Sequence, residues 1–244
     1  MMSFERAPGI GVEPAPVPPG GTTSVDTVSP AMRLQILSTE HWSLLASRSL
    51  AWNESFTRAG MFLTTLTGAI VALALVAQAA QFGDGFTLFA LVILPIVLLI
   101  GVATFLRLGT ANYHDAMCVV GMNRIRAAYL ELAPDVERYF VMSAHDDQLG
   151  IGITMGVQPG GAIFWIGQML AGTPTVVMIL NGVLAGAILS IAALRSGAGV
   201  AGILAIGALG FLVAMLLQMS WARGTIAKAR AGYRPLFPHP AADR

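Results

Sequence analysis

Four long stretches without a charged side chain limit what this chain can fold into. They cover residues 60–82, 86–106, 175–194 and 198–221. An α-helix rises about 1.5 Å per residue, so about 20 apolar residues cross the roughly 30 Å of hydrocarbon in a bilayer. Each stretch is therefore long enough to form one transmembrane helix.

The composition favours the same environment. Hydrophobic residues make up 55% of the chain and charged residues 11%, whereas a soluble domain is about 25% charged. The 14 basic and 13 acidic residues nearly cancel, so the charge gives no reason to expect a nucleic acid as a partner. We therefore predict that the lipid bilayer is the partner that the protein surface contacts. A single cysteine, Cys118, excludes a disulfide within the chain.

Short connections group the four stretches into two pairs. Residues 83–85 join the first two stretches, and residues 195–197 join the last two. Connections this short make consecutive helices antiparallel neighbours. We therefore predict an all-α membrane protein with two transmembrane helical hairpins, four spans in all.

The basic residues predict the orientation of these spans. Of the 14 lysines and arginines, Arg195 alone lies within a hairpin connection, while the others precede the first span, lie between the hairpins or follow the last span. Basic residues are retained on the cytoplasmic side of short loops. We therefore expect a multi-pass protein of the cell membrane with both its N- and C-termini in the cytoplasm.

The regions outside the spans divide the chain further. Residues 1–29, rich in proline and glycine, are predicted to be a disordered cytoplasmic tail, and residues 223–244 a basic cytoplasmic tail. Residues 30–149 hold the first hairpin with an amphipathic helix before it and a helical region after it, and we expect helices over 30–58 and 109–132 to pack together.

Residues 150–222 hold the second hairpin and an apolar segment before it. Within that segment we predict a helix over residues 162–171 that lies in the membrane interface. A fifth span there would send the basic C-terminal residues to the outside, against the charge rule just used.

Polar residues inside the predicted spans are few, and none is charged, which argues against a coupled transporter. Asn181 is the deepest amide, and Gln78 lies near the end of the first span. For Asn181 we favour an interhelical hydrogen bond over a place in an ion pathway.

Small residues recur at intervals of four in two spans: Gly60, Thr64 and Gly68 in the first, and Gly182 and Gly186 in the third. Such stripes let helix backbones approach closely within a bilayer. We expect them to serve packing within the chain first and an oligomer interface second.

A cytoplasmic polar cluster is predicted from His41, Arg48, Asn112, Asp115 and Arg126. Three further polar residues, His145, Asp146 and Asp147, follow in a loop. Their spacing matches no metal site, and we interpret them as solvated residues at helix ends and in a loop. The sequence predicts no catalytic residue, metal or cofactor.

Four short segments resemble a group of bacterial integral membrane proteins without an assigned activity. They are EHWSLLA at residues 40–46, GMNRIR at 121–126, YLELAP at 129–134 and HDD at 145–147. The resemblance implies a bacterial inner-membrane location. It brings no catalytic or binding residue to this chain.

Three functions fit these expectations. The first is a non-enzymatic assembly, scaffold or accessory subunit that works through contacts with copies of itself or with another membrane protein. The second is an oligomeric channel or passive transporter, whose path threonines and Asn181 would line. The third is an enzyme that acts on lipid at the membrane interface.

Overall fold

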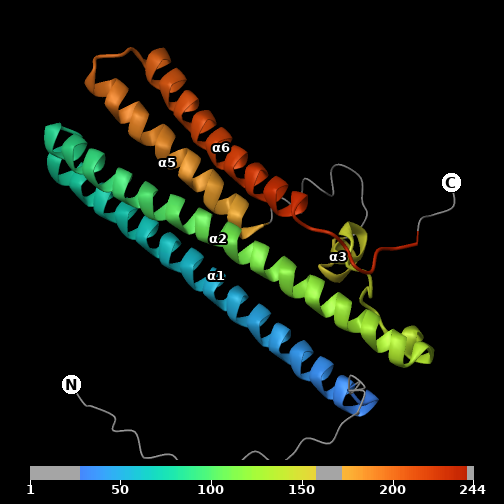
Figure 1. Cartoon of the computed structure of the whole chain (residues 1–244). Coiled ribbons are helices and arrows are strands. Elements are labelled where there is room, and N and C mark those ends of the chain that lie inside the picture. Colours follow the sequence, from blue (N-terminus) through green and yellow to red (C-terminus); the bar gives the residue numbers. More distant parts are fainter. Residues whose placement is uncertain (1–27, 158–171, 241–244) are drawn as a thin grey trace, which may run out of the picture.

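A computed structural model describes residues 28–157 and 172–240, which form helices without a strand. The helices are α1 (Pro30–Ala80), α2 (Asp84–Leu132), the 3₁₀ helix η1 (Pro134–Tyr139), α3 (Gln148–Thr154), α5 (Thr173–Arg195) and α6 (Val200–Ala231) (Figure 1). Four of them, α1, α2, α5 and α6, are long and apolar enough to cross a membrane. The prediction of an all-α membrane protein is confirmed. The N-terminal tail up to residue 27 and the predicted interfacial helix over 162–171 lie outside the described residues.

Helices α1 and α2 are far longer than a bilayer is thick. They contain 51 and 49 residues, so each extends about 75 Å. The side chain of Ser29 accepts a hydrogen bond from the Met32 amide and caps the start of α1. From there α1 continues without interruption into the predicted first span, so the expected amphipathic helix and that span are one helix.

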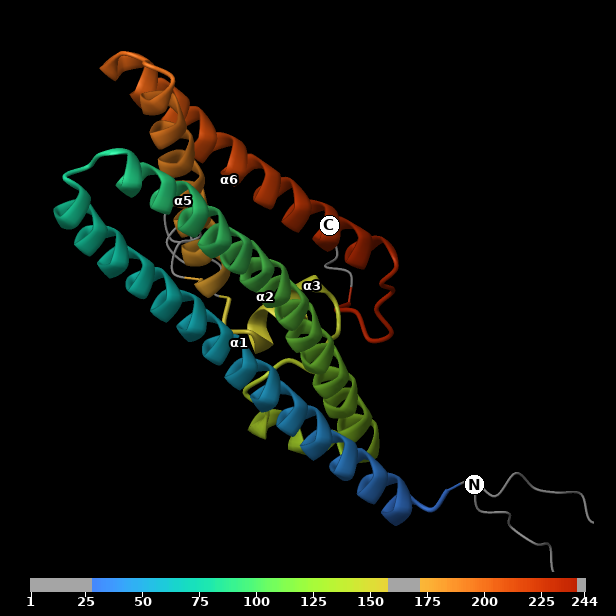
Figure 2. The ribbon, with the colours of Figure 1, turned by 90° about the vertical axis from the view of Figure 1, so that its left-hand side faces the viewer.

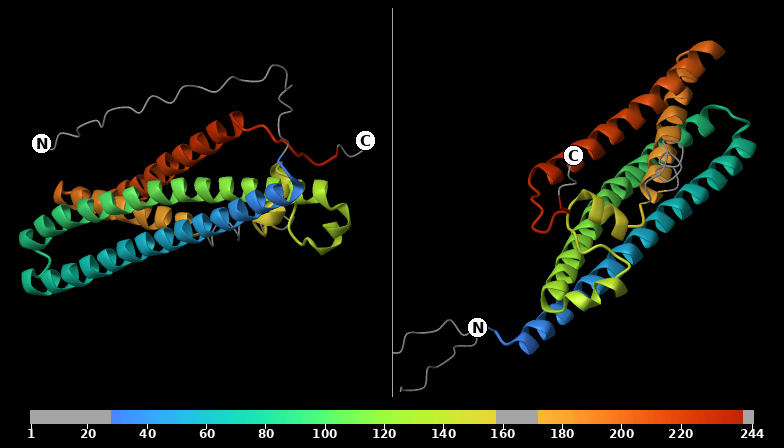
Figure 3. Two further views of the ribbon diagram at one scale, coloured as in Figure 1. Left: turned by 60° about the horizontal axis from the view of Figure 1, so that its bottom comes forward. Right: turned by 90° about the vertical axis from the view of Figure 1, so that its right-hand side faces the viewer.

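Beyond the predicted spans, α1 and α2 continue side by side past the second hairpin (Figure 3). We call residues 30–58 of α1 and 107–132 of α2 the stalk. At 1.5 Å per residue the stalk is about 40 Å long. The two predicted extramembrane helices therefore pack against each other as continuations of the first hairpin.

The four long helices form a row in the order α1, α2, α5, α6 (Figures 1 and 2). Large apolar side chains of α1, α2 and α5 meet in the core: Phe62, Leu66, Leu94, Val97, Phe105, Leu108, Val177 and Leu184. Helix α6 packs mainly on α5, and its Trp221 lies edge-on to Phe105 with ring centroids 5.7 Å apart. At the opposite end, an ion pair between Arg195 and Asp84 joins the two hairpin ends. Helix α2 thus contacts both α1 and α5 and joins the first hairpin to the second.

The two predicted stripes of small residues lie in different surroundings. In α5, a Cβ on Gly182 would lie 2.9 Å from the Phe211 ring, and one on Gly186 would lie 2.8 Å from the Gly207 carbonyl oxygen. These two glycines let α6 approach α5 closely.

The stripe in the first span needs a correction. Nothing lies within 4 Å of a Cβ built on Gly60 or Gly68, and Thr64 is exposed. Helix α1 turns Phe62, Leu66 and Ala69 toward the core, which leaves this stripe on another side of the helix. It therefore does not pack within the described chain.

Gly101 of α2 provides a test of the helix row. A Cβ at this position would lie 1.9 Å from Asn181 Oδ1 and 2.7 Å from the Phe62 ring. Gly101→Ala is therefore expected to lower the free energy of unfolding by about 1–3 kcal/mol, as overpacking of a core does. Thermal unfolding in mild detergent measures the change. Gly224→Ala in α6, where no atom of the described residues lies within 4 Å of a Cβ, is the matched control and should be neutral or slightly stabilising, because Ala is the better helix former. Equal midpoints for both variants would contradict the packing of α5 on α2.

Candidate functional site

A buried ion pair holds the two stalk helices together. Asp115 of α2 is buried, and its Oδ1 accepts hydrogen bonds from Arg48 Nε at 2.6 Å and from the Trp52 indole N–H at 3.0 Å. Hydrogen bonds between ionised partners are stronger than neutral ones. Arg48 and Trp52 are four residues apart on α1, so both reach Asp115 from one side of that helix.

Further ion pairs lie on either side of this one. Glu54 accepts two hydrogen bonds from Arg107, each 2.9 Å long, and one from Arg58 at 2.8 Å. The bonds from Arg107 and then Arg58 lower the pKa of Glu54 to about 2. Arg33 pairs with Glu131 at 3.3 Å near the far end of the stalk. Exposed pairs contribute little stability one by one, but here they bind α1 to α2 in one register.

The five residues predicted as one polar cluster do not all meet at one site. Arg48 and Asp115 form the pair just described, whereas Asn112 is exposed. His41 stacks on Tyr129 with ring centroids 6.3 Å apart, and its Nδ1 is buried without a hydrogen-bond partner among the residues that the structure describes. Burial and the nearby charge of Arg126 lower the pKa of His41. The predicted cluster is therefore divided among separate environments along the stalk.

Arg126 belongs to a second junction, centred on Asn123. The Asn123 side chain is fully buried, donates to the His145 carbonyl oxygen at 2.7 Å, and accepts from Arg126 at 2.7 Å and from the Thr154 hydroxyl at 2.9 Å. These bonds fix the loop after η1 and the short helix α3 against α2. The sequence did not single out Asn123, because its partners His145 and Thr154 lie 22 and 31 positions later in the chain.

The loop that contains His145, Asp146 and Asp147 binds the chain after α6. The Asp146 side chain is 0% exposed. It accepts hydrogen bonds from Arg124 Nε at 2.8 Å, from the Tyr233 hydroxyl at 2.9 Å, and from the amides of Leu236 at 2.9 Å and Phe237 at 2.8 Å. We call residues 145–147 together with residues 233–239 the clasp.

Asp147 adds a second set of bonds to the clasp. It caps α3 by accepting from the Gly150 amide at 2.9 Å, and it accepts from the His239 amide at 2.9 Å. The His239 ring lies 2.8 Å from the Asp147 carboxylate and 3.9 Å, centroid to centroid, from the His145 ring. Burial would raise the pKa of Asp147, but the bonds from Gly150 and His239 outweigh it and lower the pKa to about 2.

The interpretation of these loop residues as solvated is therefore wrong for Asp146. Burial would raise the pKa of Asp146, but its bonds from Leu236, Arg124, Phe237 and Tyr233 hold that pKa below the usual value. A buried carboxylate that keeps its charge needs such a full set of donors.

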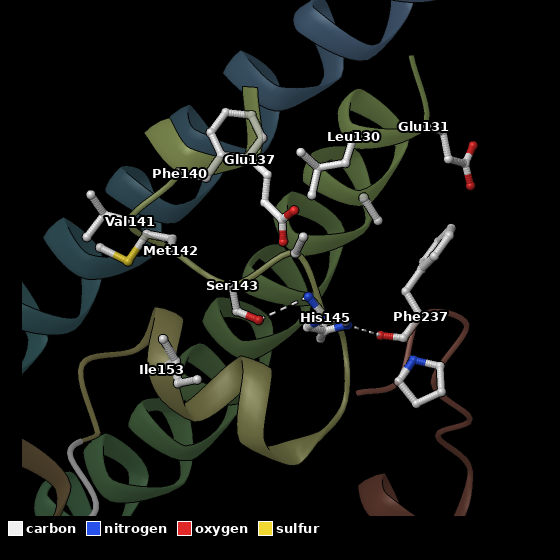
Figure 4. A pocket seen from close by; sticks show the side chains of 13 residues that line it. Leu130, Glu131, Glu137, Phe140, Val141, Met142, Ser143, His145, Ile153 and Phe237 are labelled. Atoms are coloured by element: carbon white, nitrogen blue, oxygen red, sulfur yellow. Dashed lines mark hydrogen bonds between the residues drawn. The ribbon is translucent and has the colours of Figure 1, made fainter. Parts of the chain in front are cut away.

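A pocket of about 620 Å³ lies beside the clasp (Figure 4). Its wall is mainly apolar and includes Leu130, Phe140, Val141, Met142, Ile153 and Phe237. His145 faces it, with its amide donating to Ser143 Oγ at 3.0 Å and its Nδ1 lying 3.3 Å from the Phe237 carbonyl oxygen. Within residues 28–157 and 172–240, no three His, Cys, Asp or Glu side chains are grouped so that they could hold a metal ion.

The predicted intramembrane amides occupy different environments. Asn181 is 0% exposed and donates to Gln218 Oε1 at 2.9 Å, which links α5 to α6. Gln218 in turn donates to the Ala214 carbonyl oxygen at 3.1 Å. Gln78 is exposed on α1. The observed role of Asn181 is thus a hydrogen bond between helices, the role favoured from sequence.

Removal of the Asp146 carboxylate tests the clasp. Asp146→Ala leaves the amides of Leu236 and Phe237 and the Nε of Arg124 without their acceptor, so residues 233–239 should detach from α2. We expect amide hydrogen exchange at Leu236 and Phe237 to accelerate by about tenfold or more, since each lost hydrogen bond is worth about 1 kcal/mol or more. Asp135→Ala, at an exposed carboxylate in η1, is the control and should leave these amides unchanged. Unchanged exchange in Asp146→Ala would show that other contacts hold the segment.

Acid should open the clasp at a defined point. The pKa of Asp147 is about 2 in the folded chain, whereas an unfolded Asp has a pKa of about 3.9. A lowered pKa stabilises the folded state above the unfolded value, and that contribution is lost as pH falls toward the folded value. Protection of the His239 amide should therefore be constant from pH 7 to about 4 and fall between about 4 and 2. Loss of protection already near pH 6 would contradict the assignment of this transition to Asp147.

The stalk pairs, the clasp and the Asn181–Gln218 pair are the polar assemblies from which a function can be argued. The stalk pairs join α1 to α2, the clasp joins the loop before α3 to the segment after α6, and the third pair joins α5 to α6. The stalk pairs and the clasp lie outside the predicted spans. Comparisons with protein-family models, with curated proteins and with solved structures find no match to this chain.

Proposed function

We propose that this protein is a non-enzymatic membrane scaffold or accessory subunit whose stalk binds other protein chains. The observation that carries the proposal is the stalk itself. About 40 Å of paired helix continues beyond the length that a bilayer needs, and it presents apolar side chains on its outer surface.

The outer surface of the stalk is unusually apolar for a helix in water. The Trp42 side chain is 68% exposed, and Leu45 and Leu50 are also exposed. Trp42 lies about 27 Å along α1 from the start of the predicted first span, at 1.5 Å per residue. Exposed apolar patches on water-facing surfaces mark sites of interaction with proteins or membranes.

The buried carboxylates of the stalk and clasp are already engaged in holding the fold. Asp115 accepts from Arg48 and Trp52, and Asp146 accepts from four donors. A general acid, base or nucleophile needs a reactive atom within reach of a substrate. These carboxylates are occupied, which favours a role through contacts over one through chemistry.

The charge distribution supports a cytoplasmic stalk. Its basic residues, like those after α6, belong to the side that carries all the lysines and arginines except Arg195. Under the positive-inside rule this side is cytoplasmic. The proposed scaffold would therefore be an inner-membrane protein that meets its partners in the cytoplasm.

The channel hypothesis has less support. Asn181 is fully buried, its Nδ2 donates to Gln218, and its Oδ1 has no partner among the described residues. A residue that lines a water-filled path would be reached by solvent. Asn181 thus fits better as a link between helices.

Native mass spectrometry of the full chain from mild detergent tests the proposed function. We expect the wild-type protein to carry at least one further protein chain, and we expect Trp42→Ser with Leu45→Ser to release it at least tenfold more readily. Because both side chains are exposed, the fold should survive these changes. Leu50→Ser, at a 70% exposed position on another side of α1, is the control. A wild-type protein that is monomeric, and that conducts ions in proteoliposomes unless Asn181→Leu is present, would replace the scaffold with the channel.

A further inference from the structure

Among residues 28–157 and 172–240, no helix covers one side of α1 along much of its length. The residues on this side follow one another at intervals of three and four, and we call them the α1 face: Trp42, Leu45, Ser49, Trp52, Phe56, Gly60 and Thr64. All seven are exposed, and among the described helices α1 packs mainly on α2. Trp52 and Phe56 form one edge of the face, where a small groove separates α1 from the start of α5.

The part of this face that lies outside the predicted span carries no charge. Four charged residues of the α1 stalk, Arg33, Arg48, Glu54 and Arg58, are all engaged in ion pairs. The fifth, Glu40, projects from another side of the helix at 100° per residue. Depletion of charge and enrichment in aromatic residues distinguish the centres of protein interfaces from ordinary surface. An occupant of this face must therefore be apolar and uncharged as well.

The part inside the predicted span consists of small residues with free space in front of them. No atom lies within 4 Å of a Cβ placed on Gly60 or on Gly68, which continues the same spacing. In a bilayer, small residues at intervals of four allow another helix backbone to come close. The matching occupant is a single helix that crosses the bilayer and continues into water. Its apolar residues must follow the same spacing inside and outside the bilayer.

We propose that this occupant is the α1 helix of a second copy of the same chain. Membrane insertion gives all copies one orientation, so two copies related by a twofold axis along the membrane normal bring their α1 helices together in parallel. The face is then paired with itself, and without charges the two copies do not repel each other. Spacing of three and four residues is the pattern by which two parallel helices interlock. This inference rests on the proposed scaffold function and names its partner.

The exposed area is consistent with a stable pair. Trp42, Trp52 and Phe56 are 68%, 50% and 58% exposed. An aromatic side chain offers about 150–250 Å², so these three supply roughly 350 Å² per copy. A standard interface buries about 800 Å² per partner. Leu45, Ser49 and the bilayer part of the face add to this area.

Disulfide cross-linking in native membranes tests the proposal. The cysteine Cys118 is buried, so the wild-type chain gives the background. Ser49→Cys places a thiol in the middle of the face, and Ser43→Cys places one on the same helix, also exposed, but about 120° away. A disulfide requires Cα atoms about 4.4–6.8 Å apart. On mild oxidation Ser49→Cys should give a covalent dimer, at least tenfold more than Ser43→Cys.

A second variant tests the bilayer part of the face. Gly60→Leu fills open space in the single chain, so the fold should be retained while the fraction of dimer in native mass spectra falls at least tenfold. Gly224→Leu in α6, also in open space, is the control and should leave the dimer unchanged.

The outcomes separate the proposed function from its partner. A dimer that cross-links through Ser43→Cys and not Ser49→Cys overturns the α1 face and leaves the scaffold standing. One copy of the chain bound to a different protein does the same. A wild-type protein with no bound chain at all overturns both.

Discussion

The thickness of the bilayer is the constraint on which this structure depends. About 20 helical residues cross the hydrocarbon, yet α1 and α2 contain 51 and 49. More than half of each helix must therefore lie outside the hydrocarbon. The parts inside and outside the bilayer are held together by different interactions. Inside the bilayer, burial of apolar surface gains little, because lipid is as apolar as the helices. Close packing around Phe62, Leu94 and Gly101 therefore holds the helices together there. Outside it, the Asp115 pair with Arg48 and the flanking ion pairs fix the register.

The second hairpin is tied to the first at both ends. Arg195 pairs with Asp84 where the two hairpins turn, and the clasp at the other end brings residues 233–239 back to α2 and α3. Between these points, the Asn181–Gln218 pair holds α6 to α5. A row of four helices has two open flanks. These polar ties explain how α6, which packs mainly on α5, still keeps a defined position.

The transmembrane hairpins could be predicted from sequence because their signals are local. Uncharged stretches, three-residue connections and the position of Arg195 each act over a few neighbouring residues. The continuity of α1 was also visible, since no proline interrupts it after Pro30. The sequence did not show whether residues 30–58 lie on the membrane surface or extend away from it. An amphipathic helix with an exposed Trp42 is compatible with both arrangements. The face of α1 that meets α2 depends on Phe62 and Leu66, so Gly60 and Gly68 could not be placed from spacing alone.

The clasp could not be predicted, because Asp146 and its partners Leu236 and Phe237 are about 90 residues apart. A short acidic loop and a tail containing Tyr233 and His239 each resemble ordinary solvated sequence. Their pairing follows from where α2 and α6 end in space. Asp115 was identified as a candidate, but its burial depends on Arg48 and Trp52, 67 and 63 positions earlier.

A distance along α1 tests the central claim most directly. Spin labels at Thr39 and Leu75, both exposed, are 36 residues apart on one helix. If α1 runs straight from the bilayer into water, pulsed electron paramagnetic resonance in nanodiscs, on labelled chains diluted with an excess of unlabelled chains, should give one narrow distribution near 54 Å, at 1.5 Å per residue. If the helix instead breaks near residue 58 and lies flat on the membrane, the same rise predicts about 38 Å for a right-angle bend. The shorter distance would contradict the stalk and the contacts proposed for it.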